Sequence, residues 1–131
     1  MQRIPVGTEG SFSLVIGPEH LANRFKDATL PPVLATPVMV MIMENAALNA
    51  MKPYLDVSES ALGTRVDVRH LAATPAGRLI TGEAEVTTVD GRRIEFTIRA
   101  KDGAEVVGIG THERMVIDLA KFVERLKSKF G

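Results

Sequence analysis

One apolar run limits the possible folds of this chain more than any other feature. Residues 37–51 read Pro-Val-Met-Val-Met-Ile-Met-Glu-Asn-Ala-Ala-Leu-Asn-Ala-Met and contain a single charged side chain, Glu44. The hydroxyl of Thr36 can accept a hydrogen bond from a free backbone N–H, and Pro37 suits the first helical turn because its φ is already fixed. A helix that is apolar on nearly every side is normally buried, and this one is too short to span a bilayer. The run therefore predicts a buried helix over residues 36–51.

Glu44 is the one side chain that does not fit a purely structural helix. An ionised carboxylate that is buried without a partner costs more free energy than a small domain can offset. Two interpretations follow. Glu44 lies at a wet edge of the helix beside Asn45, or it is a desolvated base or nucleophile in a reactive site.

Composition excludes several classes of protein. With 131 residues the chain has the size of a single domain, 1–131, and its 16 basic and 16 acidic residues leave no net charge to attract nucleic acid or a membrane surface. The absence of cysteine excludes disulfides, thiolate metal sites and a cysteine nucleophile. The three histidines lack metal-site spacing, and residues 1–7 contain no apolar signal core, so we expect a metal-free cytoplasmic protein.

The remaining segments predict an antiparallel sheet and a second helix. Residues 18–35 show no helical period and contain Pro31-Pro32, so they form a lid or a connection. Asp90-Gly91 is a tight-hairpin signal. Apolar residues at helical spacing predict a helix over 119–130 whose stripe covers the core or the sheet. Alternation of apolar and polar residues predicts strands at 10–16, 62–72, 79–89, 92–101 and 105–117. The order predicts an α+β domain of the hot-dog type, in which a curved five-stranded antiparallel sheet wraps around one long helix.

Short motifs over nearly the whole chain carry a family resemblance. They are Ala35-Thr36, Met39-Val40, Met43-Glu44, Pro53-Tyr54-Leu55, Leu62-Gly63-Thr64, His70, Ala72-Ala73-Thr74-Pro75, Asp90-Gly91-Arg92-Arg93 and Gly110-Thr111-His112-Glu113-Arg114. In this combination and spacing they resemble the fluoroacetyl-CoA thioesterase family of hot-dog proteins. The resemblance implies a homodimeric hydrolase that cleaves a short acyl group from coenzyme A, with no cofactor beyond the coenzyme A of the substrate.

The resemblance also implies roles for individual residues. The catalytic threonine, glutamate and histidine of the family fall on Thr36, Glu44 and His70. Its substrate-facing glycine and late arginine fall on Gly63 and Arg114. The family has an aromatic lid residue over the acyl group where this chain has Leu30. The resemblance therefore implies thioester hydrolysis more directly than it implies selectivity for the fluorinated acyl group.

Each of these residues also has a purely structural interpretation. Thr36 can be a plain helix cap, and His70 a core histidine bonded to a backbone carbonyl. Gly63 can ease a bulge in a strand, and Arg114 can be a solvated strand residue.

Helical geometry predicts that the catalytic residues come from two copies of the chain. Thr36 and Glu44 are eight residues apart, which is about 12 Å along a helix, too far for both to act on one carbonyl. Two antiparallel helices related by a two-fold axis would place Thr36 of one copy near Glu44 of the other. At the helix start the N–H of Val38 or Met39 could bind the oxyanion, since Pro37 has none.

The sequence thus favours hydrolysis of a short-chain acyl-CoA thioester, with two alternatives open. A hot-dog enoyl-CoA hydratase usually pairs an aspartate with a histidine near the helix start, and no such pair lies near Thr36. A non-catalytic acyl-CoA or small-molecule binding protein could hold Glu44 and His70 in the same way, so only an assay separates it from an enzyme.

Overall fold

The computed structural model describes all residues, 1–131. It contains five strands, three helices and two 3₁₀ turns. In chain order they are β1 (Glu9–Val15), η1 (Pro18–His20), α1 (Ala22–Phe25), α2 (Thr36–Met51), η2 (Lys52–Tyr54), β2 (Glu59–His70), β3 (Leu79–Asp90), β4 (Arg93–Asp102), β5 (Glu105–Asp118) and α3 (Leu119–Phe130).

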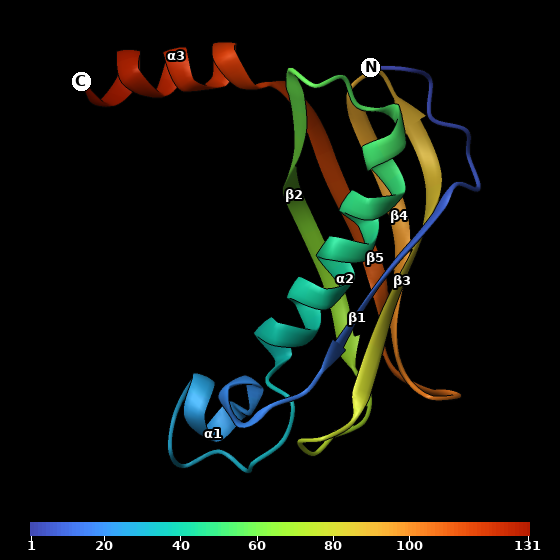
Figure 1. The fold of residues 1–131 in the computed structure, drawn as a ribbon, viewed down its shortest axis with the longest axis vertical. Helices are drawn as coiled ribbons and strands as arrows, with labels where there is room; N and C mark the ends of the chain where they lie inside the picture. The colour runs from blue at the N-terminus through green and yellow to red at the C-terminus, as the bar shows by residue number, and fades with distance from the viewer.

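The five strands form one antiparallel sheet in the order β1-β3-β4-β5-β2, and the sheet curls around α2 (Figure 1). The hairpin predicted at Asp90-Gly91 is present, and a second joins β4 to β5. Gly91 and Gly103 both have φ of +59°, a conformation that glycine adopts without steric cost, at the turns after β3 and β4. The hot-dog fold predicted from the strand–helix order is therefore confirmed.

The core lies between the sheet and one side of α2. Close packing there depends on two glycines. A Cβ at Gly82 would lie 2.7 Å from the Ile42 carbonyl oxygen, and a Cβ at Gly10 would meet the backbone of Ala46 and Ala50. The helix supplies its side of the core with Val38, Met39, Ile42, Met43, Ala46, Ala47, Ala50 and Met51.

The other side of α2, called here its uncovered side, is exposed at Thr36 and only half-buried farther along, so the prediction of a helix buried on every side is wrong for a single chain. The uncovered positions recur every four residues, which marks one face of a helix. They are Thr36, Val40, Glu44 and Leu48, with Met41 and Asn45 beside them. One curled sheet reaches only the side of the helix that faces it.

The C-terminal helix corrects a second expectation. No residue of α3 is buried, and the helix projects away from the sheet at the end of β5 (Figure 1). Asp118 starts it as the cap, because its Oδ1 accepts a hydrogen bond from the Lys121 N–H at 3.0 Å. The predicted apolar stripe exists but is exposed at Leu119, Val123, Leu126 and Phe130 instead of covering the sheet. Neither α3 nor any other helix is both long and apolar enough to cross a membrane.

The segment before α2 is more ordered than its sequence predicted. The short α1 is tied back to the loop ahead of α2, because the Ala22 N–H donates to the Val33 carbonyl at 2.7 Å. The Leu34 N–H donates to the Thr74 carbonyl at 2.7 Å, and the Ala35 N–H donates to the His20 carbonyl at 3.0 Å. These bonds fix the chain where α2 begins.

Candidate active site

Thr36 and His70 meet at the start of α2. The Thr36 hydroxyl lies 2.8 Å from His70 Nδ1, and His70 is the last residue of β2. Thr36 is the first helical residue, whereas Ala35 occupies the cap position, so the interpretation of Thr36 as the helix cap is wrong. His70 Nε2 is buried without a hydrogen-bond partner. Burial lowers the pKa of His70, and the Ala72 backbone opposes part of that shift, so the neutral ring is favoured.

Glu44 lies farther along the same uncovered side of α2 and faces Arg114. Its Oε2 lies 3.5 Å from Arg114 Nη1, and the two side chains are 34% and 9% exposed. The carboxylate is therefore paired and partly open to solvent instead of fully desolvated. Its charged partner within the chain is Arg114.

Arg114 is held in the sheet by two acceptors. Its Nη2 donates to the Ala61 carbonyl at 2.7 Å, and its Nη1 lies 3.1 Å from His112 Nε2. Burial lowers the pKa of Arg114, although the Glu44 carboxylate opposes the shift. His112 is absent from the predicted site residues, although the alternation of β5 placed it on the same face as Arg114.

Gly63 lies against the Glu44 carboxylate. A Cβ at this position would lie 2.6 Å from Glu44 Oε2 and 3.5 Å from Arg114 Nη1. The pairing of β2 with β5 shifts by one residue between Gly63 and Arg65, so the bulge interpretation is also correct. The absence of a side chain here leaves room for the carboxylate next to the strand.

The helix start differs from the prediction. The Val38 and Met39 N–H groups both donate to the Ala35 carbonyl, at 3.0 and 3.1 Å, so neither amide is free to bind an oxyanion. The Thr36 N–H donates to no group of the chain. Pro37 has no N–H, and the Val38 and Met39 amides are already hydrogen-bonded, so Thr36 provides the free amide of the first turn.

Leu30 lies in the loop between α1 and α2. The residue is 37% exposed, and its N–H donates to the Asp27 carbonyl at 3.0 Å. This loop leads to Thr36, the first residue of α2.

The site residues thus form two groups on one face of one helix. Thr36 and His70 lie at its start, whereas Glu44, Gly63 and Arg114 lie about 12 Å along its axis. No group of three or more histidine or carboxylate side chains is arranged to hold a metal ion. The geometry offers a carboxylate, an imidazole, a hydroxyl and a free amide, which are the components of acyl transfer.

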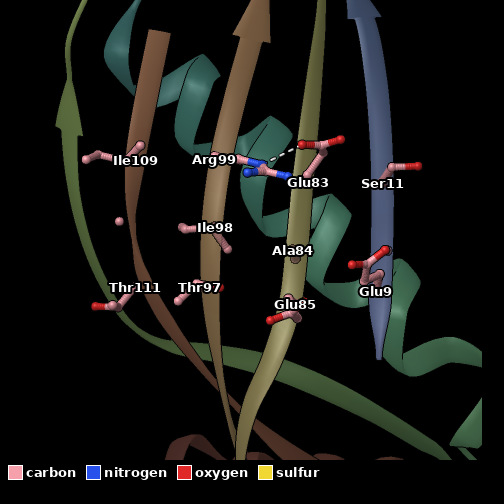
Figure 2. A pocket seen from close by; sticks show the side chains of 12 residues that line it. Glu9, Ser11, Glu83, Ala84, Glu85, Thr97, Ile98, Arg99, Ile109 and Thr111 are labelled. Atoms are coloured by element: carbon pink, nitrogen blue, oxygen red, sulfur yellow. Dashed lines mark hydrogen bonds and ion pairs between the residues drawn. The ribbon is translucent and has the colours of Figure 1, made fainter. Parts of the chain in front are cut away.

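A large hollow on the other face of the sheet is separate from both groups. Figure 2 shows it with α2 behind the strands, and its volume is about 690 Å³. Arg99 Nε donates to Glu83 Oε1 at 2.6 Å across it. None of the predicted site residues lines this hollow.

Comparison with known proteins places the chain in a family. Residues 16–120 match the profile of the fluoroacetyl-CoA-specific thioesterases. The chain is 47% identical over 102 residues to the fluoroacetyl-CoA thioesterase of Streptantibioticus cattleyicolor, over 78% of this chain and 73% of that protein. A solved structure of the fluoroacetyl-CoA thioesterase FlK superposes with a TM-score of 0.91 at 38% identity, covering 99% of this chain and 100% of the other. The structure of a thioesterase superfamily member from Thermus thermophilus superposes with a TM-score of 0.89 at 31% sequence identity. That comparison covers 99% of this chain and 98% of the other.

Fold and site together define a hot-dog protein of the thioesterase superfamily. Within that superfamily, the chain belongs to the fluoroacetyl-CoA-specific thioesterase family.

Proposed function

We propose that this protein hydrolyses the thioester bond of a short acyl-CoA at a site that two copies of the chain build together. The family and its relatives support thioester hydrolysis as the reaction. The observation that carries the shared site is the separation of Thr36 and His70 from Glu44 and Arg114 along one uncovered face of α2. One copy alone presents two incomplete halves.

The free edge of the sheet supports this assembly. β2 is an edge strand of 12 residues, and its backbone pairs with β5 on one side only. A long unpaired edge is a template for a second strand. Antiparallel pairing of two β2 strands about a two-fold axis would continue the sheet and bring the two uncovered α2 faces together. Thr36 and His70 of one copy would then oppose Glu44 and Arg114 of the other.

In this site the carbonyl oxygen of the substrate would accept hydrogen bonds at the start of α2. The free Thr36 N–H and the Thr36 hydroxyl are the donors, and the positive end of the helix dipole supports them. These donors replace the Val38 and Met39 amides, which are already bonded to Ala35.

Glu44 would supply the reactive carboxylate in one of two ways. As a general base it removes a proton from water while the water oxygen bonds to the carbonyl carbon and the C–S bond breaks. As a nucleophile its oxygen bonds to that carbon, the CoA thiolate leaves, and water then hydrolyses the resulting anhydride. His70 would accept and pass on protons, so that the departing thiolate leaves as a thiol.

Gly63 and Arg114 would border the acyl end of the substrate, beside the Glu44 carboxylate. Leu30 would cover the acyl group from the loop before α2. Because Leu30 is aliphatic, we propose that the enzyme accepts several short acyl groups and discriminates less strongly for the fluorinated one. Coenzyme A enters as part of the substrate, and we propose no resident cofactor.

Thiol release from a panel of acetyl-, fluoroacetyl-, propionyl-, butyryl- and phenylacetyl-CoA tests the reaction. We expect turnover of the smaller members, with loss of activity in Glu44→Gln. A folded protein that binds coenzyme A but releases no thiol from any member would instead support the non-catalytic binding protein.

A mixing experiment tests the shared site. Thr36→Ala and Glu44→Gln chains are each expected to be inactive as pure preparations. Co-expressed, they should regain about a quarter of the wild-type activity, because half of the dimers are mixed and each mixed dimer contains one intact site of two. If both residues act within one chain, the mixture stays inactive.

A further inference from the structure

His112 is a buried polar side chain to which the proposed reaction gives no role. It lies on β5, its exposed fraction is 0%, and its ring stacks on Phe96 of β4 with centroids 6.0 Å apart. Both ring nitrogens have partners. Nδ1 lies 2.7 Å from the Arg65 carbonyl oxygen, and Nε2 lies 3.1 Å from Arg114 Nη1.

The two partners determine which nitrogen carries the proton. A guanidinium can only donate, so Nε2 of His112 must accept from Arg114. A carbonyl can only accept, so Nδ1 must carry the hydrogen that Arg65 receives. The ring is therefore a neutral Nδ1–H tautomer. Burial and the Arg114 charge lower the pKa of His112 and keep it neutral, while the hydrogen bond to the Arg65 carbonyl and the nearby Glu44 carboxylate oppose them.

Arg114 depends on this acceptor for its orientation. The Ala61 carbonyl holds Nη2, and His112 holds Nη1, whereas Nε has no partner. Glu44 Oε2 is 3.5 Å from Nη1, longer than a good charge-assisted hydrogen bond. Without His112, one hydrogen bond would remain to hold the guanidinium plane, and the group could turn away from Glu44 and Gly63.

We propose that His112 is a positioning residue for the acyl end of the site: it accepts a hydrogen bond from Arg114 and so fixes the guanidinium beside Glu44 and Gly63. His112 is enclosed by Phe96 and the two arginine contacts, so it acts through Arg114 and does not touch the substrate. The catalytic consequence of this inference rests on the proposed function, because it assumes that Glu44 is catalytic. The orientation of the His112 ring and of the Arg114 guanidinium does not depend on that function.

Two substitutions of His112 distinguish its role as a hydrogen-bond acceptor from its role in core packing. His112→Leu introduces an apolar side chain of similar size and removes the acceptor. It should lower kcat/KM about 10- to 100-fold, the effect of losing a hydrogen bond to a charged group. His112→Gln retains an acceptor for Arg114 and should stay much closer to wild type. Ile80→Val, in the buried part of β3, is the control for core destabilisation and should leave kcat/KM unchanged.

A double-mutant cycle shows whether His112 acts through Arg114. In an Arg114→Met background, His112→Leu should cause little further loss of kcat/KM, because the group it positions is already gone. Full additivity of the two losses would overturn the proposal. Wild-type activity of His112→Leu beside an inactive Glu44→Gln would also overturn it, and would leave the proposed function intact.

The ring itself provides a readout that needs no turnover. Nitrogen-15 spectra of the wild-type protein should show His112 as a single neutral Nδ1–H tautomer through the neutral pH range. A protonated Nε2 or a charged ring would overturn the proposal even if the protein hydrolyses acyl-CoA. The expected tautomer, together with no turnover of any acyl-CoA, would refute the proposed function alone.

Discussion

The Thr36 hydroxyl lies 2.8 Å from His70 Nδ1, although 34 positions separate the two residues in the sequence. The contact exists because β2 ends where α2 begins, so the last side chain of the strand reaches the first of the helix. It leaves His70 Nε2 as the ring nitrogen without a partner. A hydroxyl and an imidazole that orient each other beside a free amide are well placed to manage the protons of acyl transfer.

Replacement of Thr36 tests this pair. Thr36→Val keeps the shape of the side chain but removes the hydroxyl, and should lower kcat/KM about 10²- to 10³-fold, because it removes a proposed oxyanion donor together with the bond to His70. Thr36→Ser retains the hydroxyl and should recover most of the activity. Equal activity in both variants, measured by thiol release, would limit Thr36 to a role in packing.

Glu44→Gln should reduce kcat by about 10²- to 10⁴-fold, the usual contribution of a general base, and should leave the melting temperature close to wild type. The amide keeps the size of the side chain at a position that is 34% exposed. Glu124→Gln, on the projecting α3, changes a glutamate far from the site and serves as the control. Substantial turnover in Glu44→Gln would show that the mechanism is wrong even though the fold is right.

Isotope incorporation separates the two roles of Glu44. A single turnover in ¹⁸O water places the label in the side chain of Glu44 if an anhydride forms and water attacks its Glu44 carbonyl carbon, which is the outcome that identifies the nucleophilic route. If Glu44 acts as a general base, the label appears only in the released acid. Mass spectrometry of the peptide that contains Glu44 measures the difference directly.

Gly63→Ala should affect activity more than folding. The added Cβ would lie 2.6 Å from Glu44 Oε2, the mobile end of a side chain, so the carboxylate shifts and the backbone stays. Gly82→Ala is the informative contrast, because its Cβ would lie 2.7 Å from the Ile42 carbonyl oxygen in the core and should lower the melting temperature. We expect a fall in kcat for the first variant without a comparable loss of stability.

The half-buried His70 and the buried His112 should make stability depend on pH. Burial lowers the pKa of both His70 and His112 in the folded protein. As the pH falls below about 6.5, the unfolded chain binds protons at these residues before the folded chain does, so the free energy of unfolding decreases. His112→Gln should flatten this dependence between about pH 6.5 and 5 in denaturant titrations. Parallel curves for the two proteins would show that His112 makes no such contribution.

The sequence was sufficient for the fold because local signals and tertiary packing agree along most of the chain. Alternation identified the strands, Asp90-Gly91 identified the hairpin between β3 and β4, and Pro37 identified the start of α2. The motifs around Thr36, Glu44 and His70 identified the family. Each signal depends only on neighbouring residues or on their spacing, which a sequence displays directly.

The contacts between these elements were decided by the tertiary structure alone. The sequence could place Glu44, His70 and Arg114 on their faces, but the position of α2 against the sheet decided that Glu44 meets Arg114 and that Thr36 meets His70. Hydrophobicity could show that α2 and α3 carry apolar residues, but only the reach of one curled sheet decided which faces it covers. The periodicity of a sequence determines which face of its helix or strand a side chain occupies. The residue that this side chain contacts depends on which distant helix or strand the fold packs against that face.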